Sequence, residues 1–256
     1  MSKVHLVIPD SHAHPEHHND RADWLGKLIK DLKPDVVVNL GDAADMPSLS
    51  AYEKGTKAFV GRAYEKDITS HLDFQERMWE PVRKSKRKRP TAVVLEGNHE
   101  HRIKKAINIQ PELEGDRYGV SFKDLDFNRY YHEVIEYEGS TPGITTIDGV
   151  SYAHYFISGV MGRPIGGEHH AYSLLAKHYS SCTCGHSHLA DFSVRTNVHG
   201  KKIMGTVAGV FQDYTSGWAG ASNSLWWRGL VIKRNVEDGV YDSEWVSIDR
   251  LRKEYG

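Results

Sequence analysis

The sequence has 256 residues, a formal net charge of −1 and 39% hydrophobic residues, values that suit a globular protein with a sizeable core. The near-neutral charge excludes a global positive field of the kind that gathers nucleic acid or an anionic membrane. No run approaches the roughly 18 apolar residues that a membrane helix needs, and the first residues lack the charged and then apolar pattern of a signal peptide. We therefore expect a cytoplasmic protein that does not associate with membranes.

The two cysteines, Cys182 and Cys184, are separated by one residue. In an extended strand such residues share one face, and they lie too close in sequence to close an unstrained disulfide. We expect buried free thiols in a reducing compartment, rather than metal ligands or a redox pair.

Five β-type runs are bounded by turn residues and cover residues 4–8, 36–40, 92–95, 150–156 and 180–184. Continuous β-branched runs of this kind predict strands that are buried on both faces. The helical spacing of apolar residues between them predicts helices over residues 23–32, 68–83 and 169–178. This alternation of strands and helices favours βαβ units around a largely parallel core sheet.

Beyond residue 188 the pattern changes to alternating runs that are separated by turns with Gly or Asn. We predict strands over residues 192–195, 202–204, 206–208, 230–232 and 244–248, which form an antiparallel meander in a second sheet. Two stretches, 46–66 and 103–146, have the size of functional loops, and we expect them to be insertions that cover the pocket. No linker or repeat divides the chain, so we expect a single domain over residues 1–256.

Four polar clusters each follow a predicted strand: Asp10-Ser11-His12, Gly41-Asp42-Ala43-Ala44-Asp45, Gly97-Asn98-His99-Glu100 and Gly185-His186-Ser187-His188. Any one of these clusters alone is a common turn or capping signal. Each of them, however, supplies carboxylate, amide or imidazole groups that bind metals, and sites in open α/β sheets form beyond the carboxyl ends of the strands. The four clusters together therefore predict one metal-rich pocket.

The clusters resemble the motifs of the calcineurin-like metallophosphoesterase superfamily, which read Asp-x-His, Gly-Asp-x-x-Asp, Gly-Asn-His-Asp/Glu, a lone His and Gly-His-x-His. The resemblance extends from Asp10 to His188. It implies an α/β fold in which a two-sheet mixed β-sandwich is flanked by helices in four layers. It also implies two divalent metal ions, for which Mn²⁺ is favoured, although His, Asp and Asn ligands also suit Fe, Zn²⁺, Co²⁺ and Ni²⁺.

By this resemblance, Asp42 bridges the two ions. The other implied ligands are Asp10, His12 and His188 for the first ion, and Asn98, His154 and His186 for the second. His154 is a single residue with two rivals, His132 and His178. It is preferred because it follows the predicted strand residues 150–153 and lies between the third and fourth clusters. Tyr155 stands where the family often has Gly, so we expect an altered pocket wall.

The resemblance implies that His99 acts on the leaving group without binding metal, and that Glu100 or Asp45 orients it. Three further residues extend the motifs and are candidates for substrate contact: His14, His101 and Arg102. The ordinary alternative for these three is a solvated position on a polar loop.

A dense basic run covers residues 84–89 and suits either a nucleic-acid backbone or the end of a helix, where cations complement the helix dipole. The second interpretation is favoured because no aromatic residue interleaves the charges. For Trp218, Trp226 and Trp227 we favour packing in the core or at the rim of the pocket over a platform for stacking bases.

The resemblance predicts a metal-dependent phosphoesterase that hydrolyses phosphate esters by attack of a metal-bound hydroxide. Protein Ser/Thr phosphatases of the superfamily carry Arg-Gly soon after the second motif, whereas Met46-Pro47-Ser48 follows Asp45 here. We therefore favour a phosphodiesterase or nuclease that acts on DNA or nucleotides over a phosphomonoesterase that acts on proteins or small molecules. A non-catalytic scaffold is disfavoured, because all seven implied ligands and His99 are present.

Overall fold

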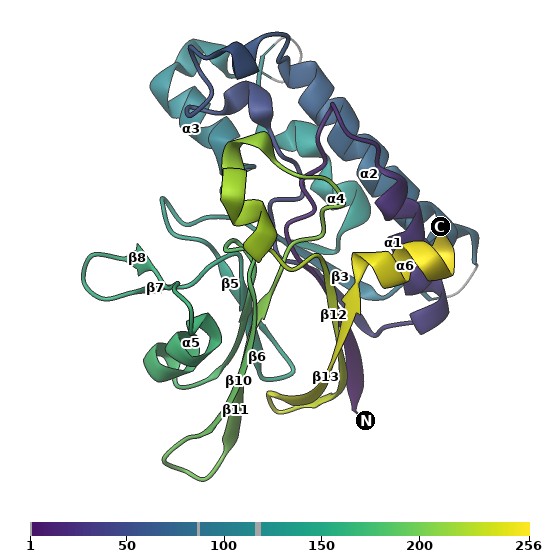
Figure 1. The fold of residues 1–256 in the computed structure, drawn as a ribbon, viewed down its shortest axis with the longest axis vertical. Helices are drawn as coiled ribbons and strands as arrows, with labels where there is room; N and C mark the ends of the chain where they lie inside the picture. Colours follow the sequence, from purple (N-terminus) through teal and green to yellow (C-terminus); the bar gives the residue numbers. More distant parts are fainter. Residues whose placement is uncertain (1, 86–87, 116–118) are drawn as a thin grey trace.

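The first sheet is built around the N-terminal strand and has the order β13-β12-β1-β2-β3-β4 (Figure 1). The structure is a computed structural model that describes residues 2–85, 88–115 and 119–256. Its strands are β1 (Lys3–Ile8), β2 (Val36–Asn39), β3 (Thr91–Leu95), β4 (Glu133–Ile135), β12 (Gly229–Glu237) and β13 (Val240–Ser247). β1 to β4 run parallel, whereas β12 pairs antiparallel with both β1 and β13.

The second sheet has the order β10-β11-β9-β6-β5. Its strands are β5 (Ile144–Ile147), β6 (Val150–Ala153), β9 (Ser181–Cys184), β10 (Ala190–Thr196) and β11 (Lys202–Ala208). The three central strands are parallel and the two edge strands are antiparallel to them. A small hairpin, β7 (Ile157–Ser158) and β8 (Arg163–Pro164), lies outside both sheets.

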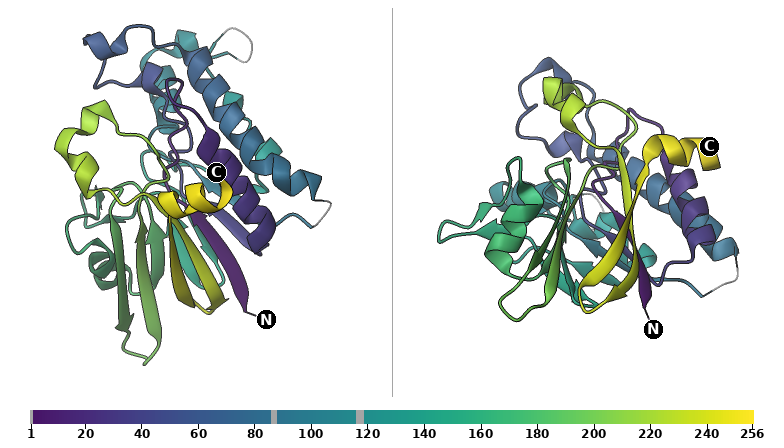
Figure 2. Two further views of the ribbon diagram at one scale, coloured as in Figure 1. Left: turned by 45° about the vertical axis from the view of Figure 1, so that its right-hand side comes forward. Right: turned by 60° about the horizontal axis from the view of Figure 1, so that its bottom comes forward.

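Helices cover the outer faces of both sheets. They are α1 (Asp20–Leu32), α2 (Tyr64–Lys84), α3 (His101–Ile109), α4 (Phe127–Tyr130), α5 (His170–His178) and α6 (Ile248–Tyr255). The right-hand view of Figure 2 shows the layers in order, with α5 outside the second sheet and α1, α2 and α6 outside the first. The predicted fold class, an α/β protein with two mixed sheets flanked by helices, is confirmed.

Two separate hydrophobic cores explain why residues on both faces of the N-terminal strand are apolar. Side chains alternate between the faces of a strand. Leu6 and Ile8 therefore pack in the core beneath α1 and α2, whereas Val7 packs between the two sheets with Tyr152 and Cys184. Both predicted buried thiols are free and fully buried in β9.

The prediction of one parallel core sheet is wrong, because the five N-terminal runs are divided between the sheets. β1, β2 and β3 belong to the first sheet, and β6 and β9 belong to the second. The run expected over residues 150–156 ends as a strand at Ala153. A hydrophobic run predicts that a strand is buried, but it does not specify the partner strand.

The prediction of a C-terminal meander in one sheet is also wrong. β10 and β11 extend the second sheet, whereas β12 and β13 return to the first, where β12 pairs with β1. Gly205 does not separate two strands as expected, because β11 continues through it. A Cβ atom there would lie 2.6 Å from the carbonyl oxygen of Ala171, so the glycine allows α5 to pack closely on the sheet.

The stretch 103–146, expected as an insertion, also contributes the edge strands β4 and β5 to the two sheets. Of the basic run, residues 86–87 lie outside the described residues. Lys84 lies at the end of α2 and pairs with Glu80, and the guanidinium group of Arg89 lies over the ring of Trp79. In the part of the chain that the structure describes, no helix combines the length and apolarity needed to cross a bilayer.

Candidate metal centre

The four predicted clusters meet at one edge of the sandwich. Because parallel strands of one sheet end on the same side, the loops after β1, β2 and β3 lie together, and so do those after β6 and β9. The first sheet supplies Asp10, His12, Asp42 and Asn98, and the second supplies His154, His186 and His188. The seven residues predicted as ligands are thus brought to a single site from both sheets.

The loops that carry these residues have an unusual backbone. His12, Asp42, His186 and His188 all have positive φ angles, of 43°, 48°, 66° and 60° respectively. Non-glycine residues rarely adopt this left-handed conformation, and residues held in it are concentrated at functional sites. The turns direct consecutive polar side chains into the site at the cost of local strain.

Two motif glycines are required by close contacts rather than by their own φ angles. A Cβ atom at Gly185 would lie 2.2 Å from Oδ1 of Asp10, and one at Gly97 would lie 2.1 Å from the backbone nitrogen of Asp42. These glycines allow the loops to approach the two aspartates closely.

The first group of candidate ligands consists of Asp10, His12 and His188, all of which are buried. Nε2 of His188 lies 3.1 Å from Oδ2 of Asp10 and 3.2 Å from Nε2 of His12. The second group consists of Asp42, His154 and His186. Nε2 of His154 lies 3.3 Å from Oδ2 of Asp42, 3.2 Å from Nδ1 of His186 and 2.9 Å from Oδ1 of Asn98.

Asp42 lies between the two groups. Its Oδ2 atom is 3.3 Å from Nε2 of His154 and 4.0 Å from Nε2 of His12. Its Oδ1 atom accepts a hydrogen bond from the backbone N–H of His99 at 2.8 Å. This is the position that a carboxylate shared by two ions must occupy.

The outer ring nitrogens of two histidines fix which atom faces the site. Nδ1 of His154 donates to the carbonyl oxygen of Leu40 at 2.9 Å, and Nδ1 of His12 lies 3.1 Å from Oδ1 of Asp45. With the proton on Nδ1, each Nε2 presents a lone pair to the centre, as in histidines that bind metals. Asp45 was not predicted to support a ligand, although its place in the second motif is the signal for it.

The charge of the site fits divalent cations. Oδ1 of Asp10 is buried and has no hydrogen-bond partner among the described residues. Burial disfavours the charged form of His154, but the carboxylates of Asp42 and Asp10 outweigh it and raise the pKa of His154 to about 9. A cluster of buried carboxylates that attracts a proton so strongly would be neutralised equally well by metal ions.

His99 lies beside these groups and faces the same cavity. Its Nδ1 atom is 2.8 Å from Oδ1 of Asp45, so Asp45 rather than Glu100 is its partner. Its Nε2 atom lies 3.0 Å from a guanidinium nitrogen of Arg102 and 3.8 Å from Oδ2 of Asp42. His99 also forms a third possible metal-binding group with His12 and Asp42, which the sequence did not predict.

Glu100 holds the second and third motifs together. Its carboxyl oxygens accept hydrogen bonds from the backbone N–H groups of Gly97, Asp42 and Ala44 at 2.8, 3.0 and 2.8 Å. Burial and the charge of Asp42 raise the pKa of Glu100 to about 7. Glu100 therefore fixes the loop that carries the bridging carboxylate.

Arg21 supports the first motif and was missed in the sequence. This fully buried residue of α1 donates to the carbonyl oxygens of Ser11 and His12 at 2.8 and 3.2 Å, and to that of Phe211 at 3.2 Å. The sequence did contain a signal for this role. Arg21 lies four residues before Leu25, so this charged side chain is on the apolar face of the helix that packs into the core.

The other predicted residues have different places. His101 lies behind the site, with Nδ1 2.9 Å from Oε1 of Glu96 and its ring stacked on Tyr137. Nε2 of His14 lies 3.6 Å from Oδ2 of Asp45. Neither His14 nor His101 is among the residues that line the cavity, whereas Arg102 is. The two rivals of His154 lie elsewhere: His132 accepts the backbone N–H of Ala92, and His178 packs on Phe156.

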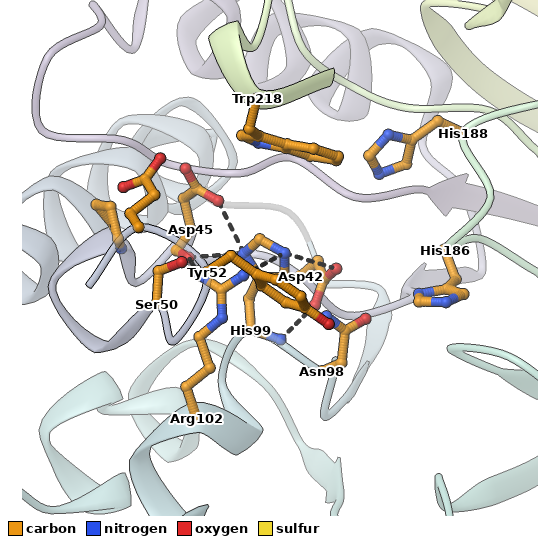
Figure 3. Close-up of a pocket in the computed structure, with 12 residues that line it drawn as sticks. Asp42, Asp45, Ser50, Tyr52, Asn98, His99, Arg102, His186, His188 and Trp218 are labelled. Carbon is orange, nitrogen blue, oxygen red and sulfur yellow. Dashed lines mark hydrogen bonds and ion pairs between the residues drawn. The ribbon is translucent and has the colours of Figure 1, made fainter. Parts of the chain in front are cut away.

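A cavity of about 380 Å³ opens onto both ligand groups (Figure 3). It is lined by Asp42, Asp45, Pro47, Ser50, Tyr52, Glu53, Asn98, His99, Arg102, His186, His188 and Trp218. Trp218 belongs to the 3₁₀ segment η5 (Gly217–Leu225) and lies at the rim, where it contacts Trp226, which in turn packs edge-on against His188. The first cavity is therefore an open pocket with the candidate ligands at its base.

Comparison with known proteins identifies the family. A model of the calcineurin-like phosphoesterases matches residues 5–200. No curated protein sequence matches the chain significantly. Among solved structures, TT1561 of Thermus thermophilus is 11% identical with a TM-score of 0.34, over 96% of this chain and 99% of that chain. Another solved structure is 12% identical with a TM-score of 0.37, over 96% of this chain and 100% of that chain.

The match to the family model spans more than half of the chain, and its range includes the seven candidate ligands of the pocket. The chain belongs to the calcineurin-like phosphoesterase family, whose members are metal-dependent enzymes that hydrolyse phosphate esters.

Proposed function

We propose that this chain is a phosphodiesterase that acts on nucleic acid or nucleotides with two divalent metal ions, preferably Mn²⁺. The observation that carries the proposal is the position of Asp42 between two groups of ligands at the base of one cavity. The first ion would be held by Asp10, His12 and His188, and the second by Asn98, His154 and His186. When bound, such ions stabilise the charge of a phosphate ester and activate water as a nucleophile.

The lining of the cavity supports a diester rather than a monoester substrate. A phosphate monoester carries nearly two negative charges at neutral pH, whereas a diester carries one. Arg102 is the one lysine or arginine among the described residues that line this cavity, and it already donates to the carbonyl oxygen of Asp45 at 2.9 Å. Asp45 and Glu53 add negative charge to the same wall. This balance favours the less charged ester.

His99 is proposed to protonate the leaving group. With Nδ1 held by Asp45, the Nε2 atom faces the cavity, where it accepts a hydrogen bond from Arg102 at 3.0 Å. Nε2 can carry a proton towards a leaving group once the guanidinium group has turned to the substrate phosphate. Burial and the charge of Arg102 disfavour the charged ring, but the carboxylates of Asp42 and Asp45 together outweigh them and raise the pKa of His99. A protonated ring in this position suits a general acid. Arg102, whose guanidinium group also lies at Nε2, is proposed to bind a phosphate oxygen.

The test is a substrate screen with the Mn²⁺-loaded protein. We expect hydrolysis of bis-p-nitrophenyl phosphate that exceeds that of p-nitrophenyl phosphate, disappears with a chelator and returns when Mn²⁺ is added. The Asp42→Asn variant is the matched control, because it keeps the side-chain size but removes the shared anion, and it should be inactive. Strong hydrolysis of the monoester with none of the diester would contradict the substrate class while leaving the metal centre intact.

A further inference from the structure

A second cavity of about 600 Å³ adjoins the first. The two share the residues Ser50, Tyr52, Asn98, Arg102 and His186, so they form one continuous depression. Figure 3 shows the first cavity with these shared residues in its wall. Residues of the segment 48–59 and of α3 line the second cavity, together with Tyr155 and Pro164. A substrate bound at the metal centre therefore has room to extend beyond the reacting phosphate.

The second cavity differs from the first in charge. Lys54, Arg102 and Lys105 line it, and no aspartate or glutamate is found among the described residues of its walls. Lys54 and Lys105 are exposed, and within the described ranges neither forms an ion pair. The first cavity, by contrast, is lined by three carboxylates and one guanidinium group. The part of the depression that lies outside the first cavity is thus lined by cations and not by carboxylates.

The arrangement of the cations suits a chain of phosphates. Arg102 and Lys105 are three residues apart on α3, so their side chains lie on one face of the helix, with Cβ atoms about 5–6 Å apart. Arg102 lines both cavities, and Lys105 lines the second one only. Lys105 therefore extends the positive charge of Arg102 into the second cavity.

Aromatic and apolar side chains occupy the rest of the wall. Tyr52, Phe59, Leu113 and Tyr155 line the second cavity, and Tyr52 is 91% exposed. Exposed aromatic faces beside cations are typical of surfaces that bind single-stranded nucleic acid, where the bases stack and the phosphates are neutralised. Paired bases of a duplex would not offer their faces to such a wall.

We infer that the second cavity binds the nucleotides next to the reacting phosphate of a single-stranded polynucleotide, with the next phosphate at Lys54 and Lys105 and a base against Tyr52 or Tyr155. This inference rests on the proposed phosphodiesterase function and adds the extended strand as its substrate. Lys54 and Lys105 would then determine substrate length without taking part in the reaction.

Binding of a short fluorescein-labelled oligothymidylate tests the inference independently of catalysis. The measurement is fluorescence anisotropy with chelator present, on the wild type and the variants Lys54→Gln, Lys105→Gln and the double variant. Each single variant should weaken binding roughly fivefold at low salt, as expected for the loss of one exposed charge contact. Each should also reduce the slope of log K against log salt by about 0.7, the value for one phosphate contact with a single strand.

Lys30→Gln is the matched control, because Lys30 is an exposed lysine on α1 and does not line either cavity. It should leave both affinity and salt slope unchanged. Unchanged binding in the double variant, or an equal loss in Lys30→Gln, would overturn the inference.

Kinetics separate this inference from the proposed function. The ratio of kcat/KM for the oligothymidylate to that for bis-p-nitrophenyl phosphate should fall in the lysine variants. A wild type that hydrolyses bis-p-nitrophenyl phosphate but neither binds nor cleaves the oligonucleotide would refute the extended substrate and leave the phosphodiesterase proposal standing. A wild type that hydrolyses no diester would refute the proposed function, and the binding measurement would still decide whether the lysines contact a strand.

Discussion

His99 offers a way to separate proton transfer from metal binding. If it serves the leaving group, His99→Gln should retain both metal ions and lower turnover by roughly 10²–10⁴-fold, the usual contribution of a positioned general acid. The loss should be smaller for p-nitrophenyl esters, whose leaving group departs with little help from a proton, than for nucleoside esters. The measurements are kcat on both kinds of ester and metal content by elemental analysis.

His99 also belongs to a third possible metal-binding group, with His12 and Asp42, so the same variant tests whether His99 is a ligand. If His99→Gln loses one metal ion, or loses activity equally for good and poor leaving groups, His99 is a ligand or a structural residue instead of a general acid.

Gly185 tests how closely the fourth motif must approach Asp10. In Gly185→Ala, the new Cβ atom would lie 2.2 Å from Oδ1 of Asp10, so the carboxylate or the loop must move. We expect a loss of the first metal ion and of activity, with a circular dichroism spectrum like that of the wild type. Gly166→Ala is the control, because nothing lies within 4 Å of a Cβ atom at Gly166. Full metal content in Gly185→Ala would show that the loop adapts without cost to the site.

At the scale of single residues, the site residues were predicted best where metal-binding residue types occur in the order of the family motifs. The seven candidate ligands were implied by the resemblance of the motifs to the family, and the structure brings them together, although their coordination of metal stays a prediction. Asp45 was predicted only as a possible partner of His99. Its contact with His12 and the role of Arg21 were not predicted, because they depend on which side chains meet across different elements. His101 was misjudged for the same reason, since its position in a motif does not reveal which way the ring points.

Among the secondary-structure elements, α2 carries a buried histidine that should make folding sensitive to acid. His71 is fully buried, with Nε2 3.1 Å from the carbonyl oxygen of Leu125, and burial lowers its pKa to about 4. In the unfolded chain its pKa is about 6.5, so between these values only the unfolded state binds the proton. The free energy of unfolding should therefore be undiminished above pH 6.5 and fall by up to about 3 kcal/mol as the pH drops towards 4.

The His71→Gln variant keeps a donor for Leu125 and removes the titration. Urea unfolding of the chelated protein should show that the difference in stability between wild type and variant shrinks or reverses as the pH falls from 6.5 to 4. His199→Gln, at an exposed histidine, should follow the wild type at every pH. Parallel curves for wild type and His71→Gln would mean that His71 is not a source of the acid sensitivity.

Most elements were predictable from hydrophobic period and turn residues, but their assembly was not. The runs that became β1, β2, β3, β6 and β9 are short and largely buried, and such runs look alike whichever sheet they join. The end of β6 at Ala153 and the continuity of β11 through Gly205 depend on contacts with other elements. Secondary-structure propensity depends on the residues of one element, whereas the order of strands in a sheet depends on contacts between elements.

For the whole molecule, the metal centre connects the two sheets. Asp10, His12, Asp42 and Asn98 follow strands of the first sheet, whereas the remaining candidate ligands follow strands of the second. Metal that binds the folded state only should stabilise the whole molecule, by about 2.7 kcal/mol at 100 times the dissociation constant. We expect the melting temperature to rise with Mn²⁺ concentration in calorimetry. Asp42→Asn should lose most of this increase, and an equal increase in that variant would show that the ions bind elsewhere.

The division of the chain between the sheets also has a consequence for its synthesis. β1 lies between β2 and β12, so one edge of a central strand stays unpaired until residues 229–237 have been made. All candidate ligands precede that point, yet the loops that carry two of them depend on residues that follow His188 in the chain. The backbone N–H of Phe211 donates to the carbonyl oxygen of Asp10, and that of Trp227 donates to the carbonyl oxygen of His188. Exposed strand edges promote aggregation. A ribosome-bound chain that ends after His188 thus holds every candidate ligand but neither the closed sheet nor the contacts that position the loops.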